Sequence, residues 1–74
     1  MRTVISTAIK EIDYNQLTGD LDITFVSGNT YRYYGVPRGI YTGFIRAPSI
    51  GTYFVRHIRD HYPYRERRII KIAS

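Results

Sequence analysis

The chain of 74 residues contains no cysteine. This absence excludes disulfide bonds, thiolate metal ligands and a cysteine nucleophile, and it fits a reducing compartment such as the cytoplasm. No stretch approaches the roughly 20 consecutive apolar residues that span a bilayer, and the N-terminus lacks the apolar run of a signal peptide. We therefore expect a soluble, cytoplasmic protein that has no membrane partner.

Catalytic and metal-binding side chains are also scarce. A nucleophile and base site needs a hydroxyl or thiol, a histidine and an orienting acid brought together. The two histidines, His57 and His61, stand four residues apart, a spacing that can place both on one metal ion, but no HExxH glutamate accompanies them. Packing of both rings beside an apolar helix stripe is the favoured interpretation. The sequence predicts no catalytic residue, metal or cofactor, and no enzyme.

Acidic residues become rare after Tyr31. Residues 32–74 hold nine Arg or Lys against Asp60 and Glu66, a net charge of +7, whereas residues 1–31 have a net charge of −2. Seven of the eight tyrosines lie in residues 31–64. Tyrosine offers a flat ring and a hydroxyl, and arginine a planar fork for phosphate, so the combination suits a nucleotide-like anion. The alternative is that Tyr fills a small core while Arg keeps the surface soluble.

The first part of the chain predicts strands within one small domain, which buries about 60% of its unfolded surface. Leu21, Ile23 and Phe25 alternate with less apolar residues, as in a strand with one buried face. Upstream, the apolar parity changes, and a bulge near residues 10–11 reconciles the two runs. Turns at residues 15–20, with Gly19 at positive φ, and at residues 27–29 then give a three-stranded antiparallel meander.

Two short helices are predicted next, over residues 37–46 and from Ile50 to about His61, with Ser49 as the cap of the second helix. The fold class is thus α+β, in one domain of residues 1–64. Residues 65–74 form a basic tail. Its isoleucines could form a fourth strand at the sheet edge, cover a partner subunit or hang loose; they are Ile69, Ile70 and Ile72.

The third strand has two different faces. Tyr31 and Tyr33 point one way, and Arg32 and Tyr34 the other, because side chains alternate across a sheet. Parity alone leaves open which face is exposed. We expect Arg32, Tyr34 and Tyr41 to share one exposed patch that stacks on a base.

A phosphate seat is predicted at the start of the second helix. Ser49 and Gly51 leave free backbone N–H groups there, and Gly51 lets a phosphate come close. Ser49 could equally do no more than close the helix. Arg56 and Arg59 are expected on the solvent side of the same helix, with Arg59 the better ligand residue.

Three ordered elements carry a family resemblance: Tyr31-Arg32-Tyr33, then Val36-Pro37, then the Ser-x-Gly-x-Tyr-Phe stretch from Ser49 to Phe54. Over residues 4 to 62 the chain resembles the KTSC domain, a short module named for its occurrence at the C-terminus of some lysyl-tRNA synthetases and also found as a free-standing protein. The resemblance implies no established activity, and it implies RNA binding as a proposed role. Tyr33 and Tyr53, within the matched motif, are expected to pack in the core. Pro48 and the basic tail depart from the pattern.

Three functions remain open at this point. The leading hypothesis is a non-catalytic module that binds RNA or another nucleic acid. The second is a homo-oligomer that sequesters a small phosphorylated or cyclic nucleotide between subunits. The third is a protein interaction module, because Tyr and Arg also anchor protein interfaces.

Overall fold

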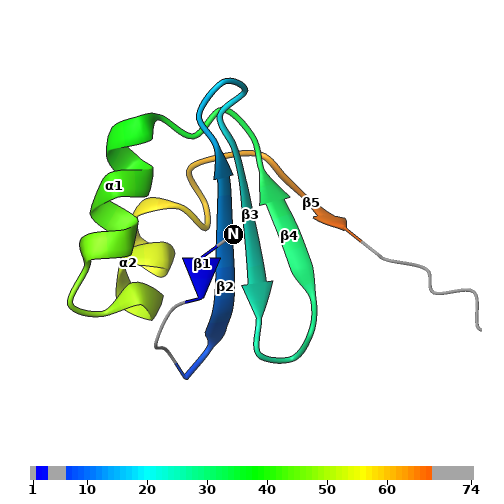
Figure 1. Cartoon of the computed structure of the whole chain (residues 1–74), viewed down its shortest axis with the longest axis vertical. Helices are drawn as coiled ribbons and strands as arrows, with labels where there is room; N and C mark the ends of the chain where they lie inside the picture. The colour runs from blue at the N-terminus through cyan, green and yellow to red at the C-terminus, as the bar shows by residue number, and fades with distance from the viewer. Residues whose placement is uncertain (1, 4–6, 68–74) are drawn as a thin grey trace, which may run out of the picture.

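The computed structural model describes residues 2–3 and 7–67 and forms one antiparallel sheet with two helices (Figure 1). The order of the elements is β1 (Arg2–Thr3), β2 (Ile9–Asn15), β3 (Asp20–Phe25), β4 (Thr30–Tyr33), α1 (Arg38–Arg46), α2 (Ile50–His57) and β5 (Tyr64–Arg67). The strands lie in the order β1-β2-β3-β4-β5. The predicted α+β fold is therefore confirmed.

The predicted meander corresponds to β2, β3 and β4. The register of β2 on β3 shifts between Ile9 and Glu11, so the predicted bulge is confirmed. Gly19 and Gly28 both have positive φ, 79° and 99°, in the two turns that join these strands. Glycine is favoured at such positions because it has no Cβ to clash with the backbone.

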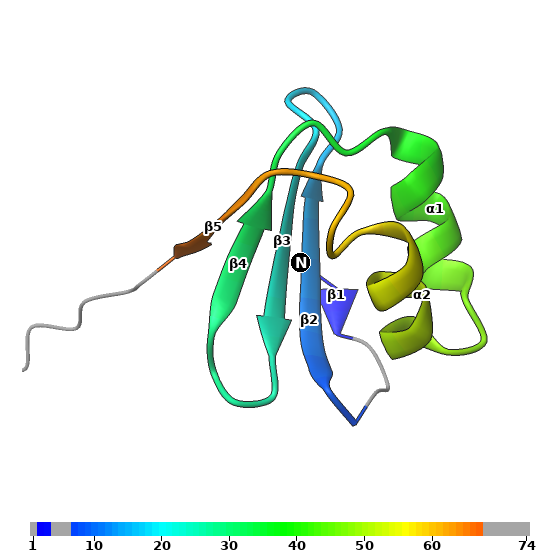
Figure 2. The same ribbon diagram turned by 180° about the vertical axis from the view of Figure 1, so that it is seen from behind.

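The C-terminal segment supplies the edge strand beside β4. Strand β5 pairs Tyr64 with Tyr33 and Arg67 with Thr30. The chain reaches this edge from α2 by crossing the end of the sheet, where the Tyr34 N–H donates to the Pro63 carbonyl at 2.9 Å (Figure 2). The isoleucines considered for this strand, at 69, 70 and 72, lie outside the described residues. The predicted domain boundary after residue 64 thus falls within β5.

Both helices pack on one face of the sheet. The core joins buried side chains of the strands to buried side chains of the helical half; they are Ile9, Ile12, Leu21, Ile23, Tyr33, Val36, Phe44, Phe54 and Ile58. The opposite face of β3 and β4 carries Asp22, Thr24, Thr30 and Arg32, none of which is buried. Tyr33 thus faces the helices, and Arg32 faces away from them.

Helix α2 ends earlier than the sequence predicts. Ser49 caps its start as expected, with its hydroxyl accepting from the Thr52 N–H at 3.3 Å. Ile58 then leaves helical geometry, with φ −122° and ψ −50°, and is completely buried. The Arg59 N–H donates to the Phe54 carbonyl at 2.9 Å, which closes the last turn. The predicted continuation to His61 is therefore wrong, because burial of Ile58 turns the chain toward the sheet.

Candidate functional site

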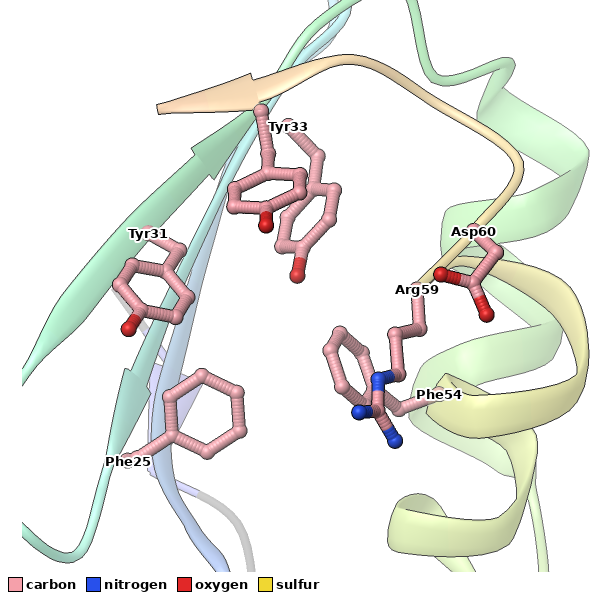
Figure 3. A pocket seen from close by; sticks show the side chains of 7 residues that line it. Phe25, Tyr31, Tyr33, Phe54, Arg59 and Asp60 are labelled. Atoms are coloured by element: carbon pink, nitrogen blue, oxygen red, sulfur yellow. The ribbon is translucent and has the colours of Figure 1, made fainter. Parts of the chain in front are cut away.

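A cleft of about 490 Å³ lies between the sheet and α2. Figure 3 shows Phe25, Tyr31 and Tyr33 on the sheet side of this space, and Phe54, Arg59 and Asp60 on the helical side. Its lining residues are Phe25, Tyr31, Tyr33, Phe54, Arg59, Asp60 and Tyr64. We call it the aromatic cleft.

The rings of the aromatic cleft hold one another in place. The Phe54 ring centre lies 5.5 Å from that of Phe25 and 5.6 Å from that of Tyr33, both edge to face. The Tyr64 ring lies 5.3 Å from Tyr33 and 5.8 Å from Tyr31. Tyr64 is 59% exposed, whereas Tyr33 is almost fully buried. The cleft therefore combines a fixed aromatic wall with one ring that is open to solvent.

The tyrosine hydroxyls of this wall differ from the tyrosine hydroxyls that stabilise the fold. Elsewhere, the Tyr14 hydroxyl donates to the Val36 carbonyl at 2.7 Å and the Tyr53 hydroxyl to the Ile40 carbonyl at 3.0 Å. Among the described residues, no hydrogen bond involves the hydroxyls of Tyr31, Tyr33 or Tyr64. Burial, followed by the neighbouring tyrosines, raises the pKa of Tyr33 to about 12. The Tyr33 hydroxyl is thus a protonated donor at neutral pH.

The early end of α2 places Arg59 at the cleft. The sequence predicts Arg56 and Arg59 on the solvent side of one helix, but the structure separates them. Arg59 follows the buried Ile58 in the turn after α2 and lines the aromatic cleft together with Asp60. Arg56 lies within α2 and lines a different hollow. Arg59 is thus the one predicted ligand residue that borders the aromatic cleft.

The patch expected from Arg32, Tyr34 and Tyr41 is not assembled. Arg32 lies on the open face of the sheet, where its Nε donates to Asp22 Oδ1 at 2.8 Å and its Nη2 to Asp22 Oδ2 at 3.1 Å. Tyr41 stacks on Tyr14 from the helical side, with ring centres 4.4 Å apart. Tyr34 follows β4 and is 38% exposed. Arg32 and Tyr41 therefore sit on opposite faces of the sheet.

The predicted phosphate seat coincides with a smaller hollow of about 270 Å³ at the start of α2. Ser49 and Arg56 line it, whereas Gly51 does not. The Ser49 hydroxyl already accepts from the Thr52 N–H and donates to the Thr52 hydroxyl at 2.9 Å. Capping the helix thus accounts for Ser49.

Six residues of the aromatic cleft were not among the predicted ligand residues: Phe25, Tyr31, Tyr33, Phe54, Asp60 and Tyr64. The packing expected of Tyr33 is confirmed, yet its hydroxyl also borders the cleft. The signal was present in strand parity, since Phe25, Tyr31 and Tyr33 share one sheet face. Strand parity did not reveal that the helices leave the sheet face uncovered around these three residues.

The two histidines contact different groups and do not form a shared site. The His57 ring lies 4.4 Å from the Tyr53 ring, and His61 Nε2 is 2.8 Å from the Arg56 carbonyl oxygen. Within residues 2–3 and 7–67, no group of three His, Asp or Glu side chains is placed to hold a metal ion. None of the helices in this part of the chain is long and apolar enough to cross a bilayer.

Comparison with protein families matches residues 5–62 to the KTSC domain. The chain belongs to the KTSC domain family. The crystal structure of a KTSC domain protein from Yersinia pestis superposes with a TM-score of 0.86 at 32% sequence identity, covering 90% of this chain and 94% of that one. The KTSC fold of this chain is thus shared along nearly its whole described length.

Two curated relatives contain a region similar to this KTSC domain. The lysine–tRNA ligase of Nostoc punctiforme is 33% identical over 60 residues, and that of Trichormus variabilis is 36% identical over 58 residues. These regions cover 81% and 78% of this chain but only 11% and 10% of the ligases. The chain therefore spans about a tenth of the length of these relatives. Tyr64 of the aromatic cleft lies beyond the matched residues 5–62.

Proposed function

We propose that this KTSC domain is a non-catalytic module that binds nucleic acid, with RNA as the foremost ligand. The observation that carries the proposal is the aromatic cleft, where five rings and the Arg59 guanidinium border one space. Aromatic rings stack on bases, and guanidinium groups pair with phosphates. An unstacked base in the cleft with its phosphate near Arg59 uses both groups.

The size and polarity of the aromatic cleft support a base as the occupant. Its volume of about 490 Å³ falls within the range of about 300–1,000 Å³ that is typical of small-ligand pockets. The hydroxyls of Tyr31, Tyr33 and Tyr64 can donate to or accept from a base edge. The Tyr33 hydroxyl, like any phenol at neutral pH, is protonated and available as a donor.

Two observations favour RNA over other anions: the names of the relatives and the positive charge of residues 32–74. The relatives named lysine–tRNA ligase act, by their names, on tRNA, and each contains a region similar to this chain. Residues 32–74 carry a net charge of +7, which attracts a polyanion from a distance.

Capture of a small phosphorylated or cyclic nucleotide by a homo-oligomer is the second candidate. One observation favours it: Ser49 and Arg56 border the hollow of about 270 Å³ at the start of α2. We rank it lower because the Ser49 hydroxyl is occupied by Thr52. A protein interface remains the third, since rings and arginines such as Tyr64 and Arg59 also anchor protein partners.

Binding of a fluorescent single-stranded RNA, measured by anisotropy at several salt concentrations, tests the proposal. Tyr64→Ala is expected to weaken binding at least about fivefold by removing a stacking ring. Arg59→Gln is expected to weaken binding and to lower the salt slope by about 0.7, the value for one phosphate contact on a single strand. Tyr64 and Arg59 are exposed, so both variants should fold.

Arg38→Gln is the matched control, because Arg38 is exposed at the start of α1 and does not line the aromatic cleft. It removes the same charge and should change affinity much less than Arg59→Gln. Equal losses of RNA affinity in Arg38→Gln and Arg59→Gln, together with an unchanged RNA affinity in Tyr64→Ala, would indicate diffuse charge attraction. That result would contradict the aromatic cleft as the binding site. Absence of RNA binding would overturn the proposal.

A further inference from the structure

A second hollow adjoins the aromatic cleft. It has a volume of about 460 Å³ and lies at the turn between β3 and β4. Its lining residues are Thr7, Ala8, Phe25, Val26, Ser27, Asn29 and Tyr31. Phe25 and Tyr31 line both spaces. We call this second space the turn hollow.

The two shared rings form a ridge between the spaces. Their centres are 5.7 Å apart and their planes meet at 64°, so one ring presents its edge to the face of the other. Phe25 is also fixed from the cleft side by Phe54. Phe54 thus contacts the ridge from the side of the aromatic cleft, and the two rings of the ridge border both spaces.

The backbone around the turn hollow is fixed by hydrogen bonds. The Phe25 N–H donates to the Asn29 carbonyl at 2.8 Å, and the Gly28 N–H donates to the Phe25 carbonyl at 2.9 Å. The Val26 N–H donates to the Ala8 carbonyl at 2.9 Å, which attaches the segment before β2. The turn hollow is thus a formed feature of the folded turn.

The chemistry of the turn hollow differs from that of the aromatic cleft. The described residues that line it include no charged side chain, and they offer the Ser27 and Thr7 hydroxyls and the Asn29 side-chain amide. Val26 adds an apolar surface that is 58% exposed. Such neutral groups suit a base, through its edge and its face, better than a phosphate.

We infer that the two spaces together bind two consecutive nucleotides of a single strand. This inference rests on the proposed function. One base occupies the aromatic cleft, the next occupies the turn hollow, and the sugar and phosphate between them cross the ridge of Phe25 and Tyr31. Bases that remain paired and stacked in a duplex cannot enter two separate hollows, so the domain selects single-stranded RNA.

Calorimetric titration with AMP, with the dinucleotide ApA, with a 12-nucleotide RNA single strand and with a 12-base-pair RNA duplex tests this inference. ApA carries no more phosphate groups than AMP, so tighter binding of ApA cannot come from added charge. We expect ApA to bind at least about fivefold more tightly than AMP, the low end of the effect of one stacked base. The duplex is expected to bind at least tenfold more weakly than a single strand of equal length.

Variants of the turn hollow separate the two spaces. Asn29→Ala removes the amide, and Ser27→Leu fills the space; both positions are exposed in the turn. Each variant should abolish the advantage of ApA and leave the affinity for AMP unchanged. Tyr64→Ala should lower the affinity for AMP and the affinity for ApA by the same factor. Gln16→Ala, exposed in the turn at the other end of β3, is the control and should change neither affinity.

The failure of this inference differs from the failure of the proposed function. Equal affinities for AMP and ApA, both weakened by Tyr64→Ala, would remove the turn hollow as a subsite and leave the aromatic cleft as a binding site. A duplex that binds as tightly as the single strand would also overturn the inference. No binding of AMP, ApA or single-stranded RNA would overturn both.

Discussion

At the scale of single residues, two glycines of α1 have opposite surroundings. A Cβ built on Gly43 would collide with the hydroxyl of Tyr53, whereas a Cβ built on Gly39 meets no atom within 4 Å. The Tyr53 ring cannot easily give way, because its hydroxyl donates to the Ile40 carbonyl and its ring packs against the rings of Phe44 and His57. The absence of a side chain at Gly43 thus lets α2 approach α1.

We therefore predict that Gly43→Ala destabilises the fold by on the order of 1 kcal/mol, because overpacking outweighs the gain in helix propensity. Gly39→Ala, the matched control, is expected to stabilise the fold by up to about 1 kcal/mol. Urea denaturation of both variants measures the difference. If Gly43→Ala proved as stable as Gly39→Ala, the contact with Tyr53 would not limit the helix packing.

Individual residues also show what the sequence could and could not predict. Alternation along β4 correctly placed Tyr31 and Tyr33 together on one face, and Arg32 on the other. Which face the helices cover depends on contacts between distant segments, so parity could not assign it. The ion-pair partner of Arg32 could not be predicted either, because Asp22 lies opposite Arg32 only through the register of β3 on β4.

At the scale of elements, one carboxylate joins the last three strands of the sheet. Asp22 of β3 accepts two hydrogen bonds from Arg32 of β4 and one, at 2.9 Å, from Nη1 of Arg67 of β5. Burial by itself raises the pKa of Asp22, but the hydrogen bond and charge of Arg32, followed by those of Arg67, outweigh burial and lower the pKa below its ordinary value of 3.8. The edge strand β5 is thus attached by charge as well as by backbone pairing.

This arrangement predicts an acid-dependent loss of stability. Because the pKa of Asp22 is lower in the folded chain, the stabilising effect of Asp22 is complete above its ordinary, unfolded pKa of 3.8 and is lost as the pH falls through the folded value. Asp22→Asn should cost on the order of 1 kcal/mol at pH 7 and flatten the acid limb of a plot of unfolding free energy against pH. Arg32→Gln should cost more than Arg67→Gln, since Arg32 donates two bonds. A wild-type acid limb retained in Asp22→Asn would contradict this role.

Element boundaries were predictable where local chemistry determines them. The bulge in β2, the glycine turns and the Ser49 cap each depend on a few neighbouring residues, and all three are confirmed. The end of α2 was not predictable, because burial of Ile58 depends on the position of the sheet. That one difference moves Arg59 to the aromatic cleft.

At the scale of the whole molecule, the sheet separates two charged environments. Its open face holds a hollow of about 320 Å³ bordered by Glu11, Asp13 and Asp22, with Arg67 beside them. The aromatic cleft, on the helix side, has Arg59 and Asp60 at its border. Three carboxylates and one guanidinium thus border the hollow on the open face, whereas one carboxylate and one guanidinium border the aromatic cleft. The net charge alone, +5, could not reveal this separation.

The last prediction follows from the position of Asp60. Asp60→Asn removes the carboxylate that borders the aromatic cleft and should increase the affinity for single-stranded RNA about two- to fivefold at low salt, as expected for one unit charge near a phosphate in water. Glu11→Gln, on the opposite face, makes the same charge change and should have a smaller effect at about 0.15 M salt, where charges are screened over about 8 Å. Anisotropy titrations of both variants at two salt concentrations measure the contrast. Equal gains for the two variants would mean that RNA responds to net charge alone, because only a ligand held at the cleft can distinguish a carboxylate beside it from one across the sheet.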